Sequence, residues 1–98
     1  MASRTLTTSG ETIFDRSRLR KSMVILNEDS AIPLFVKREA PGVTIVSSTN
    51  HDHKIGPGGA LSLNSVLDGV ETIQERWTIV AESGTPRVSF FETEDVIR

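Results

Sequence analysis

The sequence predicts an all-β domain, either a single antiparallel β-sandwich or a jelly-roll-like barrel of about seven or eight short strands. Short apolar runs of strand length recur along the chain. In most of them apolar and polar residues alternate, which is the period of a strand with one buried face. Clusters of Gly, Pro, Asn, Asp and Ser separate the runs and indicate turns.

Length and composition fit one domain. The chain has 98 residues, enough to form one core without staples. Its net charge of -2 gives no overall attraction to nucleic acid or anionic lipid, so we expect neither as a partner. It has no cysteine, which excludes disulfides and thiolate zinc sites. We find no apolar stretch of membrane-spanning length and no secretion signal.

The first residues predict a flexible arm. Residues 1–12 are polar and contain, after Met1, only Leu6 as a sizeable apolar side chain, so we expect them to lie outside the sandwich domain of residues 13–98. A basic strip follows the arm, in which Arg16, Arg18 and Arg20 occupy every second position and would share one face of a strand. Such a strip could bind an acidic protein surface or a phosphate backbone, or it could be an ordinary solvated face.

The next runs predict a hairpin. The apolar run 23–26 ends at the turn residues 27–30, and residues 31–38 then alternate. Pro33 cannot donate a hydrogen bond to a neighbouring strand, so it predicts an edge strand or a bulge at this point. Residues 43–46 predict a further short strand after the break at residues 40–42.

The middle of the chain predicts a long loop and then an ambiguous segment. Residues 47–54 are polar and residues 56–59 are Gly-Pro-Gly-Gly, after which residues 61–63 resume the alternation. The apolar residues of 66–77 fit either strands, with a tight turn at Asp68-Gly69, or one face of an amphipathic helix. We favour strands, because a central glycine costs a helix about 1 kcal/mol.

The last two runs, within residues 76–92, predict a second hairpin. Trp77, Ile79 and Ala81 alternate before the turn at residues 83–86, and Val88 and Phe90 alternate after it. Phe91 points opposite to Phe90 on the same strand and would be covered at a subunit interface. Acidic residues close by would pair with the basic strip of a neighbouring subunit, and those we consider are Glu92, Glu94 and Asp95.

No catalytic motif stands out. His51 and His53 are the weak candidates for metal ligands, with Asp52 or Glu71 as a conceivable third. They lie in a polar loop that does not fix the imidazole rings, so we expect no metal and no cofactor. The sequence has no nucleophile elbow and no phosphate-binding loop, and it gives no indication of an enzyme.

Six segments, in this order, resemble a pattern in small tailed-bacteriophage virion proteins of the capsid decoration or cement type. They are an apolar strand ending in Asn, an Ile-Pro-Leu-Phe-Val strand, a Val-Thr-Ile strand, a Gly-Pro-Gly-Gly loop before Leu-Ser-Leu, an Ile-x-x-x-Trp segment and a closing Gly-Thr-x-x-Val-x-Phe-x-Glu. They lie at residues 23–27, 32–36, 43–46, 56–63, 73–77 and 84–92.

This resemblance implies a jelly-roll-like, non-enzymatic protein of the virion that binds the assembled shell and ties capsomers together. The major capsid protein or another virion protein would be its partner, and the chain would form a homo-oligomer, a dimer or a trimer. A chain lacking residues 1–21 would then fold without attaching to the shell. The expected partner-binding residues are those of the arm and the basic strip, namely Arg4, Arg16, Arg18, Arg20 and Lys21.

Other classes of protein share parts of this pattern. One alternative is a different virion component, such as a connector or tail protein. Another is a small carbohydrate-binding β-module, although a chain with one Trp and no Tyr supplies few rings for stacking on sugars. A third is a metal-dependent cupin-like barrel, whose histidine ligands lie on separate strands, whereas both histidines here lie in one loop.

Overall fold

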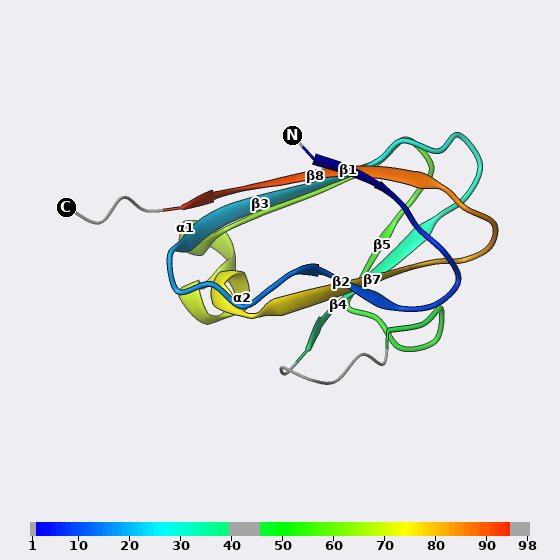
Figure 1. Ribbon diagram of the computed structural model, residues 1–98. Helices are drawn as coiled ribbons and strands as arrows, with labels where there is room; N and C mark the ends of the chain where they lie inside the picture. The colour runs from blue at the N-terminus through cyan, green and yellow to red at the C-terminus, as the bar shows by residue number, and fades with distance from the viewer. Residues whose placement is uncertain (1, 40–45, 95–98) are drawn as a thin grey trace.

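The computed structural model describes residues 2–39 and 46–94. Two four-stranded antiparallel sheets pack face to face, with two short helices at one end (Figure 1). This confirms the predicted all-β sandwich. Sheet A has the order β1 (Ala2–Thr5), β8 (Arg87–Glu94), β3 (Arg20–Asn27) and β6 (Ala60–Asn64). Sheet B has the order β2 (Glu11–Phe14), β7 (Arg76–Ala81), β4 (Leu34–Glu39) and β5 (His53–Ile55). The helices α1 (Ser65–Asp68) and α2 (Val70–Gln74) connect β6 to β7.

The strand pairing is nested. Strand β1 pairs with β8, β2 with β7, β3 with β6 and β4 with β5, as if the chain were one long hairpin. Rolling this hairpin up adds the pairs β3 with β8 and β4 with β7 and gives the two sheets. Eight antiparallel strands in this order form a jelly roll, in which the first strand, β1, lies beside the last strand, β8.

Both predicted hairpins are wrong, although the strands themselves are present. Strand β7 belongs to sheet B and β8 to sheet A, so the turn between them crosses the sandwich. The connection from β3 to β4 crosses in the same way, and among the described strands only β4 and β5 are consecutive and paired. An alternating strand buries one face equally well beside the next strand or opposite it across the core, so periodicity alone cannot distinguish the two cases.

Pro33 marks neither the edge strand nor the bulge that the sequence predicts as alternatives, since β4 is a central strand whose pairings show no register shift. Strand β4 begins just after it, at Leu34, and lies inside sheet B between β7 and β5. The missing N–H therefore falls before the ladder, while the Pro33 carbonyl accepts a hydrogen bond from the Glu82 N–H (3.2 Å). The predicted strand 43–46 lies outside the described residues except for Val46, which packs with Phe35 and Val80 on the outer face of sheet B.

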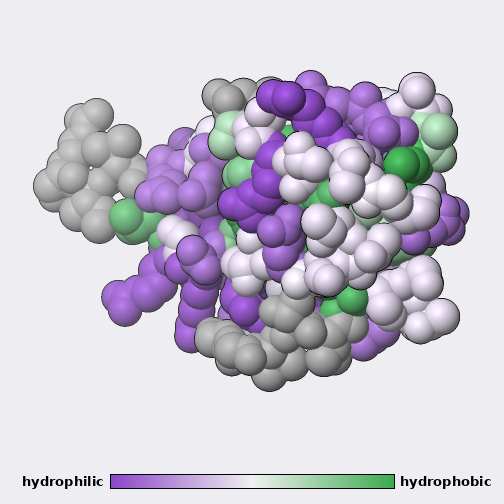
Figure 2. Space-filling model, turned by 45° about the vertical axis from the view of Figure 1, so that its right-hand side comes forward, coloured by the Kyte–Doolittle hydropathy of each residue, from purple (hydrophilic) through white to green (hydrophobic). Residues whose placement is uncertain are grey.

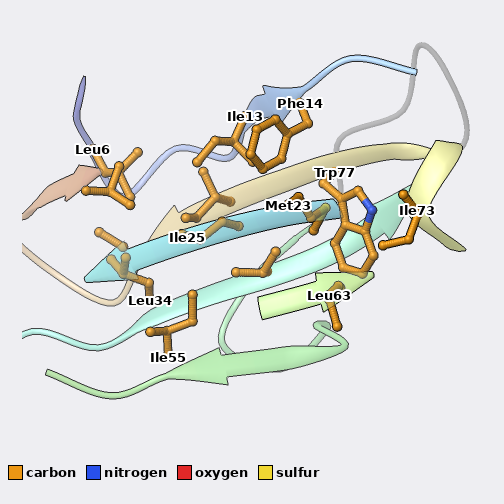
Figure 3. Packing of buried hydrophobic residues seen from close by; sticks show 14 residues of the cluster. Leu6, Ile13, Phe14, Met23, Ile25, Leu34, Ile55, Leu63, Ile73 and Trp77 are labelled. Atoms are coloured by element: carbon orange, nitrogen blue, oxygen red, sulfur yellow. The ribbon is translucent and has the colours of Figure 1, made fainter. Parts of the chain in front are cut away.

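The main core lies between the sheets (Figure 3). Trp77 is its largest side chain, is 1% exposed, and donates a hydrogen bond from Nε1 to the Thr72 carbonyl (3.0 Å). The alternating residues that the sequence assigned to the core on β7 and β8 are buried there, with Phe90 partly buried. The cluster consists of Leu6, Ile13, Phe14, Met23, Ile25, Leu34, Val36, Ile55, Leu63, Ile73, Trp77, Ile79, Ala81 and Val88.

The prediction of an arm over residues 1–12 is wrong for the described residues 2–12. They include β1 and the first part of β2, which form edge strands of the two sheets. Leu6 is fully buried, and its N–H donates to the Pro86 carbonyl (2.8 Å). A polar segment with one apolar residue can still be ordered, because the neighbouring strands β8 and β7 satisfy its backbone groups.

The segment after β6 is helical, so the favoured strand assignment and the tight turn at residues 68–69 are wrong. Asn64 caps α1, since its Oδ1 accepts hydrogen bonds from the N–H groups of Val66 (3.0 Å) and Leu67 (2.9 Å). Gly69 separates the helices with φ of 93°, a conformation that side chains other than glycine rarely adopt. Gly69, which disfavours one continuous helix, therefore connects two short helices.

Candidate protein-binding end of the sandwich

The helical end presents large apolar side chains to solvent. Val66 is 89% exposed, Leu67 82% and Val70 54%, and we call these three residues the apolar knuckle. Among the described residues, the only other large apolar side chain classed as exposed is Phe91, at 37%. Apolar residues gathered at one exposed site of a small domain indicate a contact surface for another molecule.

The local fold holds the knuckle in place. In addition to the Asn64 cap, the Asp68 carboxylate accepts a hydrogen bond from the Asn64 backbone N–H (2.9 Å). This exchange resembles a capping box, in which side chains at the start of a helix satisfy each other's backbone N–H groups. Ile73, on α2, is fully buried and anchors the helices to the core. Val66 and Leu67 therefore stand on an ordered turn.

A basic loop lies beside the helices. Residues 15–19 connect β2 to β3 and carry two exposed arginines, Arg16 and Arg18. The Ser17 N–H donates to the Gln74 carbonyl, and Gln74 Nε2 donates to the Arg18 carbonyl, both at 2.9 Å. The basic loop and the helices thus share one end of the sandwich (Figure 1). A cavity of about 440 Å³ opens there, lined by Arg16, Arg38, Glu39, Glu71, Gln74 and Glu75.

The end of the sandwich opposite the helices differs from the helical end in its surface. Figure 2 turns that end toward the reader and shows hydrophilic and neutral residues over most of the visible surface. The hydrophobic areas in this view are small and separate. The helical end is therefore the better candidate for a protein contact.

Arg20 does not belong to the exposed basic strip. It is 3% exposed, and its guanidinium makes four hydrogen bonds inside the protein. Two go to the carbonyls of Ile73 and Glu75 (2.9 Å each), one to the Asp15 carbonyl and one to the Glu92 carboxylate. Arg20 therefore ties the start of β3 to the helical end, and the prediction that it binds a partner is wrong.

The other predicted basic residues are spread over separate elements. The expected common face for Arg16, Arg18 and Arg20 does not exist, because β2 ends at Phe14 and β3 begins at Arg20. Arg4 bridges the edge strands, with Nη1 donating to the Thr12 carbonyl at 2.9 Å. Lys21, like Arg16 and Arg18, is exposed.

The predicted subunit-interface residues lie on β8. Phe91 is paired with Val24 on the outer face of sheet A, so its role at an interface stays a prediction. Glu92 forms an ion pair with Arg20 within the same chain, which makes it unsuitable as a partner for a neighbouring basic strip. Glu94 is exposed, and Asp95 lies outside the described residues.

The two histidines pack separately. The His51 ring lies 4.7 Å from that of Phe35, and the His53 ring 5.9 Å from that of Trp77. Phe35 and Trp77 belong to different apolar clusters, on opposite faces of sheet B. Within residues 2–39 and 46–94, no three His, Cys, Asp or Glu side chains gather as metal ligands.

Comparisons with protein-family models, with curated proteins and with solved structures find no match to this chain. In the part of the chain that the structure describes, no helix has the length and apolar character needed to cross a membrane.

The knuckle is the feature that the sequence did not reveal. Val66, Leu67 and Val70 fit the same apolar periodicity as Ile73 and Trp77, and this spacing predicts one buried face. Only Ile73 and Trp77 are buried. The available signal was Asn64 with Asp68 four residues later, polar groups that can cap a short helix.

Proposed function

We propose that this chain is a non-enzymatic structural protein of a bacteriophage virion, of the capsid decoration type, and that its helical end binds the assembled shell. The main observation in support is the apolar knuckle, with Val66 and Leu67 more than 80% exposed on an ordered helix. The jelly-roll strand order and the resemblance of residues 20–92 to decoration proteins also support the proposal.

The physical roles of the residues follow from their chemistry. Burying a Val or Leu side chain in a contact contributes about 1.5–3 kcal/mol. Arg16 and Arg18, beside the helices, would form a charged rim that steers and orients the contact with an acidic surface. A protein that binds the assembled shell and not its separated subunits stabilises the shell by mass action.

The knuckle can be tested with a double variant, Val66→Asp with Leu67→Asp. Both side chains are exposed, so we expect the fold to survive and the circular dichroism spectrum to stay unchanged. Loss of central anchor residues costs about 2 kcal/mol or more, so affinity for the shell should fall at least about 30-fold. The measurement is co-sedimentation with purified shells of the major capsid protein from the same virus.

The matched control is Ser83→Asp with Thr85→Asp, which places the same charges on exposed residues in the turn between β7 and β8. This control should sediment with the shells as the original chain does. If the knuckle variant sediments with the shells as well as the original chain does, the proposed site is wrong. If the original chain binds purified tails or connectors and not shells, the protein is a different virion component.

A further inference from the structure

Strand β8 is longer than the edge strand that covers it. Strand β1, as described, runs from Thr5 opposite Arg87 to Ala2 opposite Phe90. On the other side, β3 pairs with β8 as far as Glu94. Within the described residues, the last part of β8, residues 91–94, therefore has a neighbouring strand on one side only. Such an open edge is a template for another extended segment.

The open edge offers backbone hydrogen-bonding groups. The Arg87 carbonyl accepts from the Glu28 N–H on the β3 side, whereas the Pro86 carbonyl accepts from the Leu6 N–H on the β1 side. Backbone groups alternate in direction along an antiparallel strand, so those of even-numbered residues of β8 point to the β1 side. The N–H and C=O of Glu92 thus face the open side.

A cleft of about 400 Å³ lies beside this edge. Its floor is fixed, because the rings of Phe14 and Phe90 meet edge to face at 5.7 Å and the Arg20 guanidinium lies 5.0 Å from the Phe14 ring centre. Arg16 stands at the rim and forms no ion pair with any residue that the structure describes. The lining residues are Ala2, Ile13, Phe14, Asp15, Arg16, Ser17, Arg20, Phe90, Phe91 and Glu92.

The register shows which side chain of an added strand would enter the cleft. Ala2, opposite Phe90, lines the cleft, and side chains of one strand alternate between its faces. An antiparallel segment that continues the line of β1 places its residue opposite Glu92 on the face of Ala2. That side chain enters the cleft above the phenylalanine floor, where a large apolar residue fits, while an acidic side chain nearby can pair with Arg16.

The geometry points to a strand-accepting slot formed by the open edge of β8 and this cleft. The slot takes an extended segment of the partner protein to which this chain binds. The segment has a large apolar residue opposite Glu92 and an acidic residue near Arg16. In strand addition of this kind, main-chain hydrogen bonds give affinity and side-chain pockets give specificity. The partner in this inference rests on the proposed function, whereas the slot itself follows from the fold.

A tethered strand tests the slot without a partner. A Leu-Thr-Leu extension placed before Met1 puts one leucine opposite Glu92 by the register of β1. A Gly-Ser-Gly extension is the matched control, because it has the same length without apolar side chains. We expect the leucine extension to slow hydrogen exchange of the Glu92 amide by about tenfold or more relative to the control, as measured by NMR. If the Glu92 amide exchanges at the same rate in the two extended chains, the proposal of a slot is wrong.

The same two chains test the partner. If the shell protein supplies a strand, the leucine extension should weaken co-sedimentation with shells by about tenfold or more, and the control extension should not. Protection of Glu92 with unchanged attachment would show that the partner does not use the slot.

A free peptide keeps this result separate from the proposed function. If the original chain does not bind shells, the proposed function fails, and the probe becomes Ac-Asp-Leu-Thr-Leu-Asp-NH2 titrated against the labelled chain. Saturable NMR shifts at Glu92 that weaken in the Arg16→Glu variant would support the slot, and absence of shifts would overturn it.

Discussion

At the scale of single residues, environment decides what a charged side chain does. Arg20 and Arg18 are two positions apart in the sequence, yet Arg20 is 3% exposed and Arg18 is exposed. The planar guanidinium of Arg20 meets three carbonyl groups and one carboxylate at once, which a lysine ammonium with its compact geometry cannot reproduce. The sequence showed the charges but not their burial.

We predict that Arg20→Ala lowers the free energy of unfolding by about 3 kcal/mol, because it removes four hydrogen bonds and leaves buried acceptors unpaired. Arg20→Lys should recover less than half of this loss. Urea denaturation followed by Trp77 fluorescence measures the change. Arg18→Ala is the control and should leave the midpoint unchanged. A stable Arg20→Ala protein would show that these contacts contribute little.

At the scale of elements, the helical end depends on caps and on one glycine. The helices α1 and α2 have four and five residues, too short to be stable alone. Their order comes from the Asn64 and Asp68 caps and from Ile73 in the core. The apolar spacing of this segment fits both strands and a helix, and the strands that the sequence favours are wrong. The same spacing also cannot tell a short helix that faces solvent from a buried one.

We predict that Gly69→Ala destabilises the protein by about 1–3 kcal/mol, because φ of 93° is strained for any residue with a Cβ atom. Gly56→Ala is the matched control, since no atom lies within 4 Å of its added Cβ and its φ is not positive. Chemical denaturation measures both variants. If both lose the same stability, backbone strain at Gly69 is not the cause.

At the scale of the whole molecule, the nested pairing brings the first and last strands of the domain together. Strands β1 and β8 lie side by side although most of the chain separates them, so closure of the jelly roll requires contacts that are far apart in sequence. Leu6 then fills the core between the sheets (Figure 3). The N-terminal residues are therefore part of the fold, and a chain lacking residues 1–21 should not keep it.

We predict that Leu6→Ala lowers the free energy of unfolding by about 2–5 kcal/mol, the range for removing a fully buried leucine side chain. Thr8→Ala, at an exposed position of the same segment, should have no measurable effect. Equilibrium denaturation of the two variants gives the comparison. If Leu6→Ala leaves the free energy of unfolding unchanged, the result would instead support the flexible arm predicted from the sequence.

The sequence by itself determined that the protein is built of strands, where most of them lie, and which residues of β7 and β8 enter the core. These properties depend on alternation within a few neighbouring residues, which the sequence displays directly. Only the tertiary structure decided which strands pair, that Arg20 is buried, and that Val66 and Leu67 face solvent. These outcomes depend on neighbours that are distant in sequence, and local periodicity is the same whether such a neighbour is present or not.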